Sequence, residues 1–271
     1  MSISAVFALL ITTKMVDFGQ YQVEGKTKSE VSGSENSLPD RWSAEQAEYL
    51  AHSPEVANLH FAQEYLPLGD KHVEEKMLQH LKAYSYDRVR SYRMHEIAET
   101  ALPIVEEILL SYGIPADFKY IPMVESGFTK HVTSHKGASG YWQFMPATAR
   151  AYGLTVNDEV DERQDLIKST HAAARYIKAL NQEFDNWVLT AAAYNVGSGS
   201  LRRSINSQGE ENYFKLKLNR ETASYVYRLI STKEVIENPD RHGYEAVEKR
   251  ILTAQDLSED RRSPSQGIQL Y

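Results

Sequence analysis

The stretch that most limits the fold is NWVLTAAAYNVGSG, residues 186–199, which is apolar on almost every side until Tyr194. A helix without a polar face has to be surrounded by other elements, so it belongs at the centre of a domain. Its glycines are expected to end it. Residues 165–184 and 220–236 form further expected helices, the first with a clear apolar face. No segment shows sustained two-residue alternation, so the fold class is predicted to be mainly α.

Helical spacing also runs through the N-terminal half. Residues 70–84 repeat apolar side chains behind Asp70, which can cap the first turn. Residues 88–112 show the same period, with Ile104 on the expected apolar face. Pro103 is expected to kink this helix or to split it in two.

Composition divides the chain into five segments. Residues 1–19 contain an apolar stretch that is too short to span a bilayer and lacks a preceding positive charge, and we interpret it as an imperfect export signal. Residues 20–40 are polar and are predicted to be a disordered linker. We expect an N-terminal helical extension over residues 41–100, the main domain over 101–245 and a tail over 246–271.

The charge balance narrows the class of ligand. A net charge of −7 argues against a nucleic-acid partner, whereas a neutral polymer such as a glycan is compatible with it. The 17 tyrosines and three tryptophans suit stacking on sugar rings, although most are expected in the core. The chain has no cysteine, and His131 and His135 lie in a loop without an acidic third ligand at matching spacing. We therefore predict no metal ion and no other cofactor.

A single acid interrupts the apolar run YIPMVESGF. If Glu125 is buried beside its apolar neighbours, its charged form loses hydration and its pKa should rise. A carboxyl group that is still protonated near neutral pH can give its proton to a leaving oxygen. The alternative is that Glu125 pairs with a cation or points outward from a helix end.

Two other polar segments accompany this acid. Residues 134–154 hold a Gly-rich loop in which Gln143 can bind a sugar amide or hydroxyl, or equally satisfy the backbone of its own loop. Tyr194 and Asn195 are the first hydrogen-bonding groups after the apolar helix. The Tyr194 hydroxyl needs a partner when buried, and either a carboxyl in the same cavity or a backbone carbonyl would serve.

Taken together, these segments resemble the lytic transglycosylase (SLT) family, in particular its membrane-bound murein transglycosylase D type. The family pattern has Glu-Ser and an aromatic residue, Ser-x-x-Gly-Ala-x-Gly, Trp-Gln, Pro-x-Thr, Ala-Tyr-Asn and Arg-Glu-Thr-x-x-Tyr-Val. The matching stretches here are ESGF, SHKGASG, YWQFMPATA, AAYNVGSG and RETASYV, spread over about residues 102–244. Each motif alone is weak, but their order and separation are specific.

The resemblance implies a lysozyme-like helical domain, of the goose type, with an N-terminal helical extension. Glu125 would be the only catalytic acid and would then act as the base. Tyr194 is expected near the carboxyl of Glu125, and Trp142 against the sugar. The residues expected to line the groove are Ser134, Gln143, Tyr194, Asn195 and Tyr225.

The implied substrate is peptidoglycan, cut at the β-1,4 bond from N-acetylmuramic acid to N-acetylglucosamine with formation of a 1,6-anhydro end. Hydrolysis, as in a muramidase or chitinase, normally needs a second carboxylate. That alternative would gain weight if Asp161, Glu162 or Asp165 faced Glu125, although we interpret these acids as helix-capping and surface charges. A non-catalytic glycan-binding module is the alternative from another class. We expect a monomer in the periplasm or cell envelope, with peripheral membrane or wall association.

Overall fold

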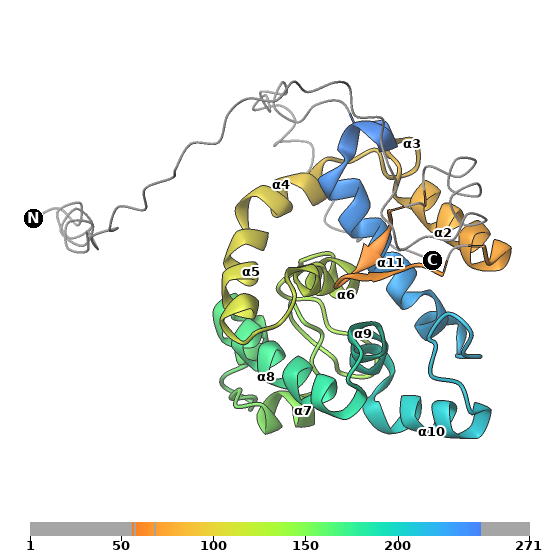
Figure 1. The fold of residues 1–271 in the computed structure, drawn as a ribbon. Coiled ribbons are helices and arrows are strands. Elements are labelled where there is room, and N and C mark those ends of the chain that lie inside the picture. Colours follow the sequence, from red (N-terminus) through yellow and green to blue (C-terminus); the bar gives the residue numbers. More distant parts are fainter. Residues whose placement is uncertain (1–55, 57, 68, 245–271) are drawn as a thin grey trace, which may run out of the picture. The chain divides into compact units, whose positions relative to one another are not determined.

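The computed structural model describes residues 56, 58–67 and 69–244, shown in colour in Figure 1. The expected export signal, linker and C-terminal tail lie outside the described residues. Within the described part the fold is mainly helical, which confirms the predicted class. The only sheet there is a two-stranded antiparallel pair of β1 (His60–Phe61) and β2 (Glu64–Tyr65).

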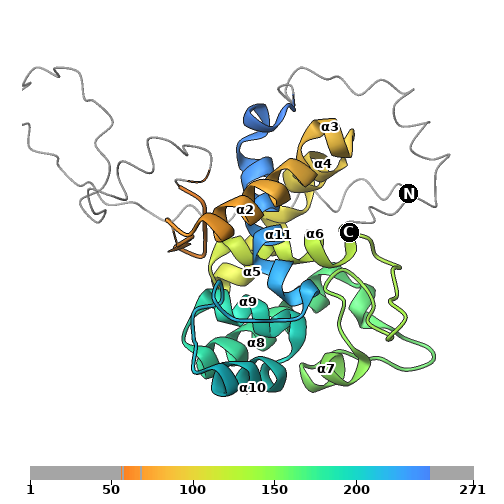
Figure 2. The same ribbon diagram turned by 90° about the vertical axis from the view of Figure 1, so that its right-hand side faces the viewer.

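The helix expected over residues 70–84 is confirmed as α2 (Lys71–Tyr84). It begins where the carboxylate of Asp70 accepts hydrogen bonds from two backbone N–H groups of the first turn. Its apolar side chains are buried at helical spacing, and α2 lies along α11 (Arg220–Glu237) in both views (Figures 1 and 2).

The helix expected over residues 88–112 is divided. After the short α3 (Tyr86–Val89), α4 (Arg93–Thr100) ends and α5 (Leu102–Ser111) begins with Pro103 in its first turn, where the missing N–H costs no hydrogen bond. The predicted split is thus confirmed, but the predicted apolar face is wrong for Ile104, which is 42% exposed. The buried face consists of Leu102, Val105 and Leu109.

The apolar helix is the centre of the domain, as predicted. It is α9 (Trp187–Val196), it buries residues 188–193, and it packs against α8 (Leu166–Phe184) and α11. The prediction that its glycines end this helix is confirmed at Gly197. Gly197 ends α9 at a φ of 83°, and α10 (Ser198–Gln208) begins at the next residue, so the glycine redirects the chain into a new helix.

Shorter elements surround this centre and carry the polar segments. The chain passes from η2 (Ala116–Tyr120), a 3₁₀ helix, into α6 (Ile121–Ser126), and then through a long loop into α7 (Pro146–Ala151). Two more 3₁₀ helices are η3 (Glu162–Gln164) and η4 (Pro239–His242). Among the residues that the structure describes, no helix is long and apolar enough to cross a bilayer.

Candidate active site

Glu125 occupies the last turn of α6, a helix of only six residues. The first four of these residues are buried, and Gly127 ends the helix in the left-handed conformation. Glu125 itself is half-buried. So short a helix has little stability of its own, so the position of the acid depends on the elements packed around it.

The carboxyl group of Glu125 accepts a hydrogen bond from the hydroxyl of Tyr225, with 2.6 Å between the two oxygens. Burial raises the pKa of Glu125 to about 7, against the opposing effects of this hydrogen bond and of the positive charge on Arg228. The predicted rise in pKa is confirmed. Near neutral pH the group is therefore divided between its acid and carboxylate forms, which suits a residue that first gives a proton and then takes one.

Helix α11 presents three side chains to this acid. Glu221, Tyr225 and Arg228 follow one another at spacings of four and three residues, which places them on one face of the helix. The negative charge of Glu221 raises the pKa of Glu125, and the charge of Arg228 lowers it. Nη2 of Arg228 also donates to the backbone oxygen of Val124 at 2.7 Å. Tyr225 was expected from the sequence, but Glu221 and Arg228 were not. Their i, i+4, i+7 spacing could have indicated that all three share one face of the helix.

Tyr194 lies close enough for the charge of Glu125 to contribute, after burial, to raising the pKa of the tyrosine. Its hydroxyl, however, donates to the backbone oxygen of Trp142 at 2.8 Å. Of the two partners considered from the sequence, the backbone carbonyl is therefore the one observed. Tyr194 stands beside the acid and holds the loop that precedes α7.

Trp142 is fully buried, and its indole N–H donates to the hydroxyl of Thr170 at 3.0 Å. The expectation that its ring lies against a sugar is wrong, because no part of the side chain reaches the surface. Trp142 instead fixes the Gly-rich loop to α8, which leaves its backbone oxygen available to Tyr194.

Gln143 and Ser134 both serve the backbone of this loop. The side-chain amide of Gln143 donates to the backbone oxygens of Val132 and Gly140, at 3.0 and 2.9 Å. The hydroxyl of Ser134 accepts from the N–H of Ala138 at 3.0 Å. Of the two uses considered for Gln143, the structure thus shows the one in which it satisfies the backbone of its own loop. Ser134 is exposed and stabilises a local turn. Their predicted contact with substrate stays a prediction.

Asn195 links α9 to α11. Its side-chain oxygen accepts from the hydroxyl of Thr222 at 2.9 Å, and its side-chain nitrogen donates to Glu221 at 3.3 Å. Tyr194 and Tyr225 thus act directly on Glu125, whereas Asn195 contacts Glu221 and Thr222 on α11, and the predicted contact of these residues with substrate stays a prediction.

Part of the chain is similar to known proteins. Residues 105–217 match the family model described as Transglycosylase SLT domain. Over 186 residues the chain is 33% identical to Membrane-bound lytic murein transglycosylase D of Escherichia coli (strain K12), a match that covers 66% of this chain and 39% of that protein. Over 92 residues it is 40% identical to Peptidoglycan transglycosylase gp16 of Escherichia phage T7, covering 33% of this chain and 7% of that protein.

A solved structure is also similar, namely an inactive mutant of Lytic Transglycosylase Slt from Pseudomonas aeruginosa. It has a TM-score of 0.42 and 18% identity, and covers 73% of this chain and 35% of that chain. A likeness of that degree establishes nothing by itself. The chain spans about two fifths of the length of the murein transglycosylase D that it matches.

The loop between α6 and α7 is anchored by a buried arginine that was not expected from the sequence. Nη1 of Arg163 donates to the backbone oxygens of Gly137 and Phe144, at 2.8 and 2.9 Å, and the guanidinium also pairs with Asp161 at 2.7 Å. Gly140 packs so tightly here that an added Cβ would lie 2.0 Å from the backbone oxygen of Arg163. The available signal was a lone Arg among the acids of DERQD, residues 161–165, of which only the acids were interpreted from the sequence.

The three acids near this arginine are engaged away from Glu125. Asp161 pairs with Arg163, Glu162 pairs with Lys168 at 2.6 Å, and Asp165 caps α8. They do not supply the second carboxylate that hydrolysis would need. Among the described acids, Glu221 is instead the one whose charge acts on Glu125. No group of three potential metal ligands occurs in the described part of the chain.

The stretch that matches the SLT family model does not include the helices that contact the last turn of α6 or cover them. It ends at residue 217, before α11, and it begins at residue 105, after α2 and α4. Tyr225 and Arg228 therefore lie outside the matched stretch, although both contact the helix that carries Glu125.

Proposed function

We propose that this protein is a lytic transglycosylase that cleaves the β-1,4 bond from N-acetylmuramic acid to N-acetylglucosamine in peptidoglycan. The observation that carries the proposal is a half-buried carboxyl group with a pKa of about 7, hydrogen-bonded to Tyr225 within an SLT domain. The names of the two curated relatives, a murein and a peptidoglycan transglycosylase, support the same substrate.

One acid of this kind can complete the reaction. Glu125 in its protonated form gives its proton to the bridging oxygen as the bond from that oxygen to C1 breaks. The N-acetyl group of the sugar stabilises the positive charge at C1. The 6-hydroxyl of the same sugar then attacks C1, and Glu125, now ionised, takes the hydroxyl proton. The product is a 1,6-anhydro end, and no water is consumed.

Tyr225 has a defined part in this cycle. Its hydroxyl donates to the carboxylate and so favours the ionised form, while burial favours the protonated form. Burial raises the pKa of Tyr225 well above its ordinary value, so the hydroxyl stays a donor throughout. Because burial and the hydrogen bond from Tyr225 act in opposite directions, both the protonated and the ionised form of Glu125 are populated at neutral pH.

Hydrolysis is the second candidate, and the position of Glu221 is the observation in its favour. A second carboxylate whose charge reaches the acid can orient a water molecule, as inverting glycosidases require. Glu221 is exposed and accepts a hydrogen bond from Asn195. The two reactions differ in one measurable respect, because hydrolysis adds a water molecule to the product.

Mass analysis of the soluble fragments from purified sacculi tests both candidates. We expect anhydro ends with the wild-type protein, and no fragments with Glu125→Gln, because an amide cannot deliver the proton. Glu107→Gln, which changes an exposed acid on α5, is the matched control and should cleave normally. Reducing ends would identify a hydrolase, and binding without fragments would identify a glycan-binding module.

We also propose that the protein acts as a monomer in the cell envelope, where peptidoglycan lies, with peripheral membrane or wall association. The substrate and the membrane-bound description of the murein transglycosylase D support this. Cell fractionation followed by detection with an antibody to the protein would test its localisation. Light scattering would test its oligomeric state. Recovery in the cytoplasmic fraction alone would contradict the proposed localisation.

A further inference from the structure

The helix that carries Glu125 is held from behind by Arg228. Nη2 of this arginine donates to the backbone oxygen of Val124, the residue directly before the acid, at 2.7 Å. The guanidinium also attracts the carboxylate of Glu125. Arg228 therefore holds the backbone of the last turn of α6 and also attracts the carboxylate that this turn carries.

Arg228 is in turn in contact with the N-terminal extension. The hydroxyl of Tyr84, the last residue of α2, faces its guanidinium. Tyr84 is 5% exposed, and its backbone oxygen accepts a hydrogen bond from the buried hydroxyl of Tyr244 at 2.9 Å. Within the described residues, the Tyr84 hydroxyl and Nε of Arg228 are both buried and have no hydrogen-bond partner of good geometry. No other hydrogen bond therefore competes with the attraction between the Tyr84 oxygen and the guanidinium.

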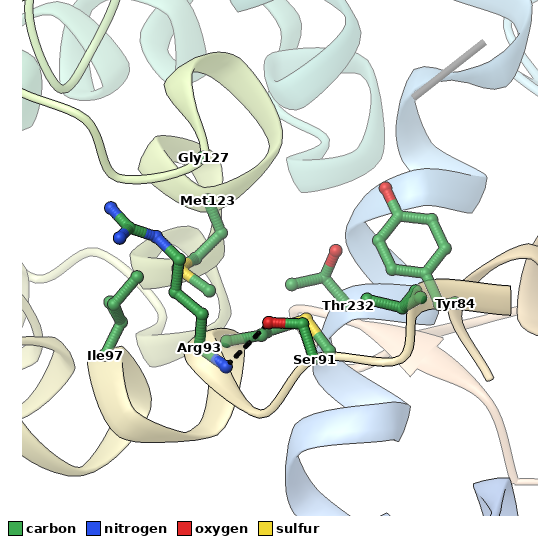
Figure 3. Close-up of a pocket in the computed structure, with 9 residues that line it drawn as sticks. Tyr84, Ser91, Arg93, Ile97, Met123, Gly127 and Thr232 are labelled. Carbon is green, nitrogen blue, oxygen red and sulfur yellow. Dashed lines mark hydrogen bonds between the residues drawn. The ribbon is translucent and has the colours of Figure 1, made fainter. Parts of the chain in front are cut away.

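Tyr84 lies on the side of α6 that faces away from the Glu125 carboxyl group. A small cavity of about 30 Å³ separates the extension from α6. Figure 3 shows Tyr84 and Thr232 on one side of the cavity and Met123 and Gly127 on the other. Met123 lies two residues before Glu125 and Gly127 lies two residues after it. Tyr84 therefore faces the side of α6 opposite to the Glu125 side chain.

The extension is firmly packed where it makes this contact. Lys76, near the middle of α2, donates to the backbone oxygen of Ala223 on α11 at 2.6 Å. One turn further, His80 stacks on Tyr227 with 5.7 Å between ring centroids. These two contacts hold successive turns of α2 against successive turns of α11, and Tyr84 lies one turn beyond His80.

We infer that Tyr84 is a positioning residue, which holds Arg228 against the end of α6 and so makes the N-terminal extension a working part of the active site. Tyr84 does not itself touch the acid; it acts through Arg228. The groups that face Glu125 are Glu221, Tyr225 and Arg228 from α11 and Tyr194 from α9, and of these only Arg228 meets the Tyr84 hydroxyl.

The variant Tyr84→Phe tests the inference, because it removes one oxygen and keeps the buried ring. We expect a freer Arg228 to attract the carboxylate less, so that Glu125 titrates at a higher pH than in the wild type. The titration is followed by carbon NMR of glutamate-labelled protein, with Glu125→Gln assigning the signal. We also expect kcat on sacculi to fall about tenfold with little change in KM, as a small misplacement of a catalytic group would cause.

Tyr120→Phe is the matched control. It removes a hydroxyl that donates to Glu237 at the far end of α11, at 2.9 Å, so it should lower the melting temperature and leave the titration of Glu125 unchanged. Arg228→Lys keeps the charge but loses the planar fork, and we expect it to move the titration in the same direction as Tyr84→Phe.

The kcat measurement rests on the proposed function, whereas the titration needs no turnover. If the wild type cleaves nothing, the proposed function fails and the titration still decides about Tyr84. A Tyr84→Phe protein in which Glu125 titrates as in the wild type would overturn the inference, as would an equal movement of the titration in Tyr120→Phe.

Discussion

Replacing Glu125 by glutamine should make the folded protein more stable in alkaline solution and no more stable in acid. The pKa of the acid rises from 4.5 to about 7 on folding, chiefly because burial penalises the charged form. The folded state therefore prefers the protonated group. This preference contributes fully below pH 4.5 and is lost as the pH rises through about 7, where the ionised acid becomes a cost of folding.

The magnitude follows from the two pKa values. A difference of about 2.5 units corresponds to about 3 kcal/mol, since one unit is worth about 1.4 kcal/mol. Glutamine has no charge to bury and can still accept the hydrogen bond from Tyr225, so Glu125→Gln should recover most of that amount above pH 8. For a protein of this size about 3 kcal/mol corresponds to a rise in melting temperature of roughly 6–12 °C.

Thermal unfolding of both proteins at pH 4 and at pH 8.5 measures the effect. The difference in melting temperature should be close to zero at the lower pH and should grow between pH 4.5 and 7. Glu107→Gln, which changes an exposed acid, should show no such growth. A constant difference across this range would refute the reasoning, because it would mean that Glu125 ionises as freely in the folded protein as in the unfolded chain.

The remaining predictions concern the groups around the acid. Tyr225→Phe removes a hydrogen bond to the ionised form, worth about 1.5–3 kcal/mol, so the alkaline limb of the pH–rate profile should move up by about one pH unit or more; a downward movement would contradict this. Tyr194→Phe frees the loop at the Trp142 carbonyl and should slow sacculus digestion about tenfold, and a wild-type rate would remove Tyr194 from the site. Gly140→Ala places a Cβ against the Arg163 backbone and should lower the melting temperature markedly, whereas an unchanged value would show that the loop can yield.

The sequence predicted the elements whose period is strong and local. The buried row of α2, the split at Pro103 and the central position of α9 all follow from the pattern of neighbouring residues. The raised pKa of Glu125 was predictable for the same reason, because four apolar residues stand directly before it. The end of α9 at Gly197 was likewise predictable from its glycines, whereas the start of α10 at the very next residue was not.

The rest of the site depends on contacts between segments far apart in the chain. Tyr225 reaches the acid over 100 residues and Arg228 reaches Val124 over 104, and no periodicity reports such a distance. Trp142 was misjudged because its expected contact with the sugar came from the family resemblance and not from its own local sequence. Here the loop folds back, and the indole finds a hydroxyl on α8. Arg163 was missed since only the folded loop shows how many carbonyls converge on it.

These long-range contacts explain why the recognisable domain and the working site have different limits. The stretch that matches the SLT family supplies the acid and the loop pinned by Arg163, but a six-residue helix cannot fix a carboxyl group by itself. The hydrogen bond that favours the carboxylate and the cation that holds the helix end both come from α11, beyond residue 217. Helix α11 is in turn covered by α2, which precedes residue 105. A carboxyl group with a pKa near 7 is therefore a property of the chain from α2 to α11, because removing either helix would change the charge and the hydration around it.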